Sequence, residues 1–219
     1  MLLTNCTRER IWTYSADPYS RRPPLLDKTV VVLPLTDARE DTNKEMLYMW
    51  FVPLVPFGWA NLNAPEEASV HVTSLDWSFD PDEDIAKAIA EELNNSRIFK
   101  EVSFSRKATD GDFVLRGVIK STYYSGEKYS YGLSVLSFPM WLIGFPYGTA
   151  SNELHITLTL EDPGTEEVLW KHDSRRGKDS TSWIYTFKPD FLYEDLLKGT
   201  IKLEVLPSLK QTFTRDSAK

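Results

Sequence analysis

One helix signal, at residues 79–99, constrains the fold of this chain more than any other feature of its sequence. The segment reads FDPDEDIAKAIAEELNNSRIF. Asp80 suits the N-cap, Pro81 suits the first helical position, and Glu83 completes a capping box. Apolar side chains then recur at helical spacing, at Ile85, Ala88, Ile89 and Leu93. The pattern predicts an amphipathic helix whose apolar face must be covered.

Strand patterns precede and follow this helix. Residues 28–35, KTVVVLPL, form a short and nearly unbroken β-branched run that predicts a buried central strand ending at Pro34. Residues 100–105, KEVSFS, alternate as a strand does. A strand–helix–strand unit of this kind predicts a right-handed crossover.

Further elements follow in the second half of the chain. We expect a strand at 111–124, a hairpin at 153–173 and one long helix at 189–213, bent near Gly199 and Pro207. The expected fold is therefore α+β (α/β-like), with helices on one face of a mixed sheet of about five strands. Residues 28–213 would form a single domain with insertions at 40–78 and 125–152, followed by a tail at 214–219.

The N-terminal sequence resembles the end of a bacterial lipoprotein signal. Leu3-Thr4-Asn5-Cys6 matches a lipobox, although Asn5 departs from the usual small residue. Only five residues precede Cys6, so residues 1–5 are interpreted as the remnant of a signal peptide. Residues 6–27 are polar and Pro-rich, and we expect them to form a flexible tether that starts at a lipidated Cys6. The alternative is a disordered N-terminus with an incidental cysteine.

Composition excludes several classes of protein. The net charge is −7, which makes a nucleic acid an unsuitable partner. The single cysteine excludes an intrachain disulfide and a Cys-based zinc site. No run of about 18 apolar residues is free of charges and helix breakers, so no spanning helix is predicted.

The order of elements and several local motifs resemble a group of bacterial envelope lipoproteins. This group includes the curli-secretion-channel lipoprotein and the N-terminal domain of the Tol-system propeller protein. The resemblance covers roughly residues 28–213 without the insertions, and its motifs lie at 30–39, 88–105, 112–119 and 166–173. It implies a scaffold that works through contacts with other envelope components, and it carries no catalytic residue to this chain.

Two aromatic segments, 45–62 and 131–152, interrupt the predicted domain. Each contains a Pro-aromatic-Gly sequence. The first segment carries no charge after Glu45, and the second carries none before Glu153. They could pack together into a second core, form an exposed patch that binds a partner or a second copy, or enter a membrane interface. Neither segment shows strand alternation, so a pore is disfavoured. The expected contact residues are Trp50, Phe51, Phe57, Trp59, Phe138, Trp141, Phe145 and Tyr147.

Residues with catalytic potential are few. The three histidines, His71, His155 and His172, lack metal-ligand spacing, and no nucleotide-binding motif is present, so we expect neither a metal nor a cofactor. His155 and His172 would lie on opposite arms of the hairpin, where they could be neighbours. Asp37, Arg39 and Asp41 follow the first strand and form the best candidate for a polar ligand cluster, with a salt-bridged loop as the alternative.

These features together predict a non-enzymatic, lipid-anchored protein of the bacterial cell envelope. The expected location is the outer membrane, on its periplasmic side, with membrane lipid and envelope proteins as partners. One alternative is an oligomeric outer-membrane secretion component, in which the chain forms a homo-oligomer. Another is an envelope-glycan enzyme that uses paired carboxylates.

Overall fold

Helices cover one face of a mixed sheet, which confirms the predicted α+β class. The sheet contains nine strands in the described part of the chain, whereas about five were predicted. A separate two-stranded sheet joins β1 (Arg10–Ile11) and β6 (Trp77–Ser78) in parallel. The computed structural model describes residues 10–40, 42–68, 72, 77–108, 111–186 and 188–216.

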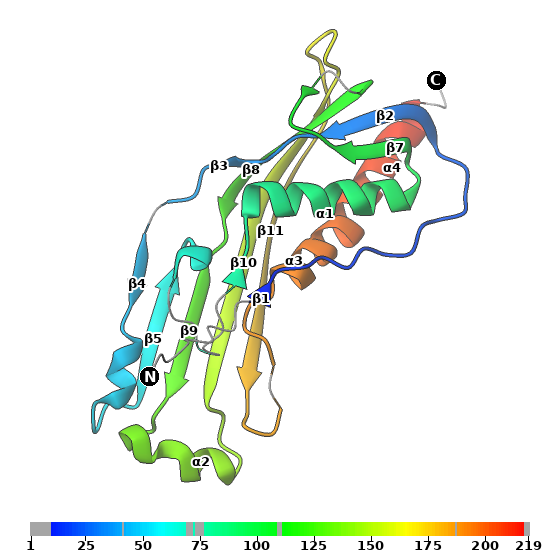
Figure 1. Cartoon of the computed structure of the whole chain (residues 1–219). Coiled ribbons are helices and arrows are strands. Elements are labelled where there is room, and N and C mark those ends of the chain that lie inside the picture. The colour runs from blue at the N-terminus through cyan, green and yellow to red at the C-terminus, as the bar shows by residue number, and fades with distance from the viewer. Residues whose placement is uncertain are drawn as a thin grey trace, which may run out of the picture.

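A long antiparallel hairpin runs the length of the molecule (Figure 1). Its strands are β10 (Gly148–Glu161) and β11 (Val168–Ser182). Two consecutive strands, β8 (Phe113–Ser121) and β9 (Tyr124–Tyr129), follow one another along the other edge of β10. Because β9 pairs with the first part of β10 and β8 with the second part, the sheet divides into two halves.

Each half is completed by different strands. Beside β8 lie β2 (Leu26–Val32) and β7 (Phe99–Phe104), both parallel to the strand they pair with, and the short β3 (Thr36–Asp37). Beside β9 lie β5 (Phe57–Leu62) and β4 (Asn43–Glu45), both antiparallel. The parallel pairing of β2 with β7 is the arrangement predicted for the two strands around the helix.

The β8 half carries the helices and the main core. One face is covered by α1 (Pro81–Ser96), α3 (Tyr193–Thr200) and α4 (Leu206–Asp216) (Figure 1). The predicted hairpin alternation is confirmed, because four leucine and isoleucine side chains of β10 are at most 1% exposed beneath these helices: Leu154, Ile156, Leu158 and Leu160.

Helix α1 begins at Pro81 as predicted, but its predicted capping box is wrong. The side chain of Asp80 makes no capping hydrogen bond. The Asp84 carboxylate instead accepts a hydrogen bond from the Asp80 backbone N–H at 2.9 Å. Glu83 does not take the capping-box role because its carboxylate pairs with Lys87 at 2.8 Å and with Arg106. Tertiary partners therefore decide which acidic residue closes the first turn.

The C-terminal helix is continuous and contains a π-helical segment, η5 (Ile201–Val205), between α3 and α4. This segment lies between Gly199 and Pro207, where a bend was predicted. Proline lacks the N–H that an α-helical turn requires, so a wider turn just before Pro207 is a reasonable local solution. The helix begins at Tyr193 and not at residue 189.

Residues 10–25, called the N-terminal strap here, pack on the helical half and do not behave as the expected tether. Trp12 is only 7% exposed and its ring lies 5.0 Å from that of Phe79. The Tyr14 hydroxyl donates to Glu92 at 2.8 Å, and the Ser20 N–H donates to the Asn95 carbonyl at 2.9 Å. The strap is extended and makes separate contacts, so it has no periodic sequence pattern that would reveal its packing.

The two predicted insertions build the β9 half of the sheet. The expectation that they lack strand alternation is wrong for residues 57–62, which form β5 with every second residue buried. Its buried residues are Gly58, Ala60 and Leu62. Because two of these are glycine and alanine, a hydrophobic pattern alone does not show the alternation.

Candidate functional site

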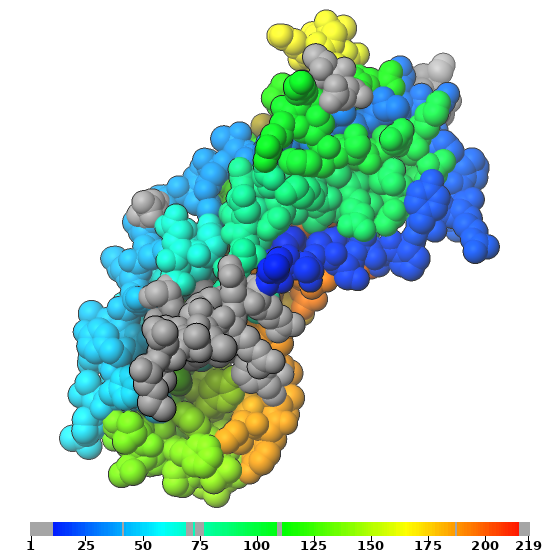
Figure 2. All heavy atoms as spheres, viewed as in Figure 1, coloured from blue at the N-terminus to red at the C-terminus, as the bar shows by residue number. Residues whose placement is uncertain are grey.

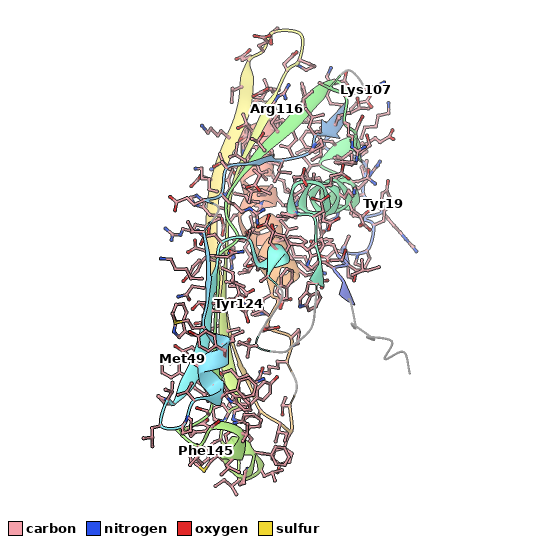
Figure 3. The ribbon with its side chains drawn as sticks, turned by 60° about the vertical axis from the view of Figure 1, so that its left-hand side comes forward. Tyr19, Met49, Lys107, Arg116, Tyr124 and Phe145 are labelled. Atoms are coloured by element: carbon pink, nitrogen blue, oxygen red, sulfur yellow. The ribbon has the colours of Figure 1, made fainter. Side chains whose placement is uncertain are left out.

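Three uncharged segments of the chain meet at the end of the β9 half. They are residues 46–57, 129–147 and 183–186, and together they are called the aromatic tip here. The first contains the 3-10 helix η1 (Leu47–Phe51), and the second contains η4 (Ser134–Ser137) and α2 (Phe138–Leu142). In Figure 3, Met49 and Phe145 lie together at this end, whereas Arg116 and Lys107 lie at the other.

Exposed apolar side chains are concentrated in the aromatic tip. Nineteen large hydrophobic residues of the described chain are exposed, and fourteen of them belong to the tip: five within 46–54, seven within 133–145, and two at 184–185. Leu54 is 89% exposed, Leu136 72% and Ile143 71%. Figure 2 shows the three segments side by side at the lower end of the molecule, in cyan, green and orange. Because contiguous apolar surface of this kind is uncommon on monomeric proteins, the tip is the candidate interaction site.

Two tryptophans hold the inner side of the tip together. The rings of Trp50 and Trp141 stack with centroids 5.9 Å apart, and both indole N–H groups donate to the carbonyl of Tyr129, at 3.1 and 3.2 Å. The ammonium of Lys128 lies 5.0 Å from the Trp50 ring. Burial lowers the pKa of Lys128, since the charged form is less favourable away from water.

A small second core supports the tip from the sheet. It consists of Ala60, Leu62, Val72, Tyr124 and Ala150, with Leu47 and Tyr147 packed against it. Gly58 is required beside η1, because a Cβ there would lie 2.4 Å from the Leu47 carbonyl oxygen. Small residues on this face of the sheet therefore allow η1 to approach the backbone closely.

The structure separates the eight predicted contact residues into two groups. Phe51, Phe138 and Phe145 are exposed, at 61%, 50% and 44%. The other five are half-buried: Trp50, Phe57, Trp59, Trp141 and Tyr147. The second core and the exposed patch were alternatives at the sequence level, and the structure contains both.

Part of the tip was missed. Residues 183–186 follow β11 and join the tip through Tyr185, whose hydroxyl donates to the Leu142 carbonyl at 2.6 Å. The available signal was the uncharged stretch at 180–187, which contains Trp183 and Tyr185. It was overlooked because it is short and lies far along the chain from the other two segments.

The predicted ligand cluster after the first strand is a structural joint. The Arg39 guanidinium, 8% exposed, pairs with Asp37 at 2.7 Å and with Glu66 at 2.6 Å, and donates to the Thr122 hydroxyl at 2.6 Å. Burial alone would lower the pKa of Arg39, but the hydrogen bonds to both carboxylates raise it overall. The bond to Arg39 also holds the pKa of Asp37 below its ordinary value. Asp41 lies outside the described residues.

The histidines are not brought together. His155 bonds to Asp173 at 3.0 Å, and His172 bonds to Glu204 of the C-terminal helix at 3.4 Å. His172 lies opposite Leu158 and shares its face of the hairpin, whereas His155 belongs to the other face, so the expected proximity is wrong. His71 lies outside the described residues. No group of three or more potential metal ligands occurs within the described ranges.

The acidic residues before and within the first turn of α1 influence one another. A hydrogen bond with Asp82 is the main reason why the pKa of Asp80 is raised to about 6, and burial and the neighbouring charges of Asp84 and Glu83 add to it. These carboxylates lie at the start of a helix and have local partners, which is the expected structural role of such a cluster.

The described helices include none that is long and apolar enough to cross a membrane. Cys6 lies outside the described residues, so the lipidation prediction is carried by sequence alone.

Comparison with known proteins finds no matching family model and no matching curated protein. Solved structures that match this chain in part include XCC0632 from Xanthomonas campestris, of the DUF330 family, which is 13% identical over 96% of this chain and 99% of that one, with a TM-score of 0.48. The PelC dodecamer from Paraburkholderia phytofirmans is 14% identical over 89% and 94%, with a TM-score of 0.40. The lipoprotein GNA1162 from Neisseria meningitidis is 9% identical over 82% and 99%, with a TM-score of 0.28. Similarity at this level assigns neither a family nor a function.

Proposed function

We propose that this chain is a non-enzymatic, lipid-anchored protein of the bacterial cell envelope that binds membrane-associated partners through its aromatic tip. The observation that carries the proposal is the gathering of fourteen exposed large hydrophobic side chains at one uncharged end of the fold. A water-facing surface of this kind is unfavourable unless something covers it. The proposed location is the periplasmic side of the outer membrane.

The proposed anchor fits this use of the tip. Cys6 lies four residues before Arg10, where β1 begins, so an acyl chain on Cys6 would be attached within about 14 Å of β1. Along the length of the molecule, β1 lies between α1 and the tip (Figure 1). An acyl chain there would keep the tip at a high effective concentration near the membrane and its resident proteins.

Acylation provides the test of the proposed function. The full-length gene, with its natural upstream codons, would be expressed in a lipoprotein-competent host with labelled palmitate. We expect label in the wild-type protein and none in Cys6→Ser, together with a shift of the variant from the membrane to the soluble fraction. Unlabelled wild-type protein, or an unchanged location of Cys6→Ser, would contradict the proposed lipid anchor.

A further inference from the structure

Several side-chain donors in the aromatic tip are bonded to the tip's own backbone. Besides the two indole N–H groups on the Tyr129 carbonyl, the Tyr131 hydroxyl donates to the Pro146 carbonyl at 2.5 Å. The Ser134 hydroxyl donates to the Phe51 carbonyl at 2.6 Å. The Tyr185 hydroxyl is likewise bonded to a carbonyl of α2. These polar atoms therefore have partners within the tip itself.

The irregular backbone of the tip is also well paired. Four prolines, at 53, 56, 139 and 146, have no N–H to satisfy. The Leu54 N–H donates to the Gly132 carbonyl at 2.9 Å, and the Phe145 N–H donates to the Met140 carbonyl at 3.1 Å. Non-helical backbone can enter an apolar environment at low cost only when its polar groups have internal partners.

These features favour lipid over protein as the material that covers the tip. Protein interfaces typically carry about one hydrogen bond per 100–200 Å² and use Trp, Tyr and Arg as anchors that donate to the partner. The tip has no arginine, and two of its three tryptophans, Trp50 and Trp141, already donate their indole N–H groups to the Tyr129 carbonyl. A bilayer interface requires no such donors from an apolar surface.

The charge distribution also indicates which lipids are involved. Attraction to anionic headgroups requires clustered Lys or Arg, and the three tip segments contain none. The adjoining Lys128 is half-buried against Trp50. Binding should therefore depend on apolar contact and not on surface charge.

From this geometry we infer that the aromatic tip inserts into the interfacial region of a lipid bilayer and needs no anionic lipid. The inference rests on the proposed function, because it names the membrane itself as what the tip contacts. Strands β9, β10 and β11 extend toward the tip, so the helical half would be held away from the bilayer (Figure 1).

Vesicle flotation tests the inference independently of the anchor. The full chain carrying Cys6→Ser would be floated with phosphatidylcholine vesicles, with and without phosphatidylglycerol, at about 0.05 and 0.5 M NaCl. The tip variant is Leu136→Asp with Ile143→Asp. The matched control is Leu203→Asp, since Leu203 lies outside the tip and is 66% exposed, compared with 72% and 71%.

We expect flotation with pure phosphatidylcholine that is unchanged by salt or by anionic lipid. The tip variant should lose at least about tenfold in partitioning, because apolar area is replaced by charge, and Leu203→Asp should retain it. Three results would overturn the inference: no flotation of the unsubstituted tip, flotation only with anionic vesicles at low salt, or equal loss in the control. A lipid-free dimer that the tip variant abolishes would identify a second copy as the occupant instead. Since Cys6 is already replaced, none of these outcomes depends on acylation.

Discussion

The Arg39 joint gives the sharpest prediction about stability. Arg39 connects the chain after β3 with Glu66 and with Thr122, which lies between β8 and β9, so it ties together the two halves of the sheet. The Glu66 side chain is 12% exposed, and its Oε2 has no hydrogen-bond partner in the described part of the chain. Arg39→Ala would therefore leave a largely buried carboxylate without its cation.

We expect Arg39→Ala to lower the free energy of unfolding by about 3–5 kcal/mol, the usual cost of removing one partner of a buried ion pair. Asp37→Asn should cost only about 0–1 kcal/mol, because the Asp37 side chain is 46% exposed and its loss leaves the pair of Arg39 with Glu66 intact. Replacing both Arg39 and Glu66 with methionine should restore part of the loss, since no unpaired buried charge remains.

Urea unfolding, followed by far-UV circular dichroism, measures these differences from the midpoint and the slope. An Arg39→Ala cost below about 1 kcal/mol would refute the assignment of Arg39 as a buried structural joint. It would then be reasonable to return to the ligand-cluster interpretation.

Three further predictions concern other parts of the fold. The folded-state pKa of Asp80, raised to about 6 chiefly by its hydrogen bond with Asp82, exceeds the ordinary value of 3.8, so its stabilising effect is present below that value and is lost as pH rises through about 6. Asp80→Asn should reduce the change in the thermal unfolding midpoint between pH 3.8 and about 6. A pH profile identical to that of the wild-type protein would contradict this. Gly58→Ala should destabilise the protein by about 1–3 kcal/mol, measured by urea unfolding, because its Cβ meets the Leu47 carbonyl; a neutral result would show that η1 can move aside. Trp12→Ala should cost about 3–5 kcal/mol and Trp12→Phe much less, whereas a freely moving strap would tolerate both.

Some parts of this protein are determined by the sequence alone. The span of α1, the buried face of β10 and the parallel pairing of β2 with β7 follow from patterns within each segment. Local periodicity is sufficient here because each element buries one face against a large common core. The absence of charge in two of the three tip segments was visible in the same way, and so were most of the aromatic residues that build the tip.

Other features depended on the tertiary structure. Nothing near Arg39 in the sequence indicates that its second carboxylate comes from Glu66, and nothing local shows that residues 183–186 join the tip. The strap around Trp12 and the alternation of β5 were hidden because isolated anchors and small residues give no hydrophobic period. Sequence patterns record how a segment meets water or a core, whereas the identity of its partner is set by where distant segments converge in space.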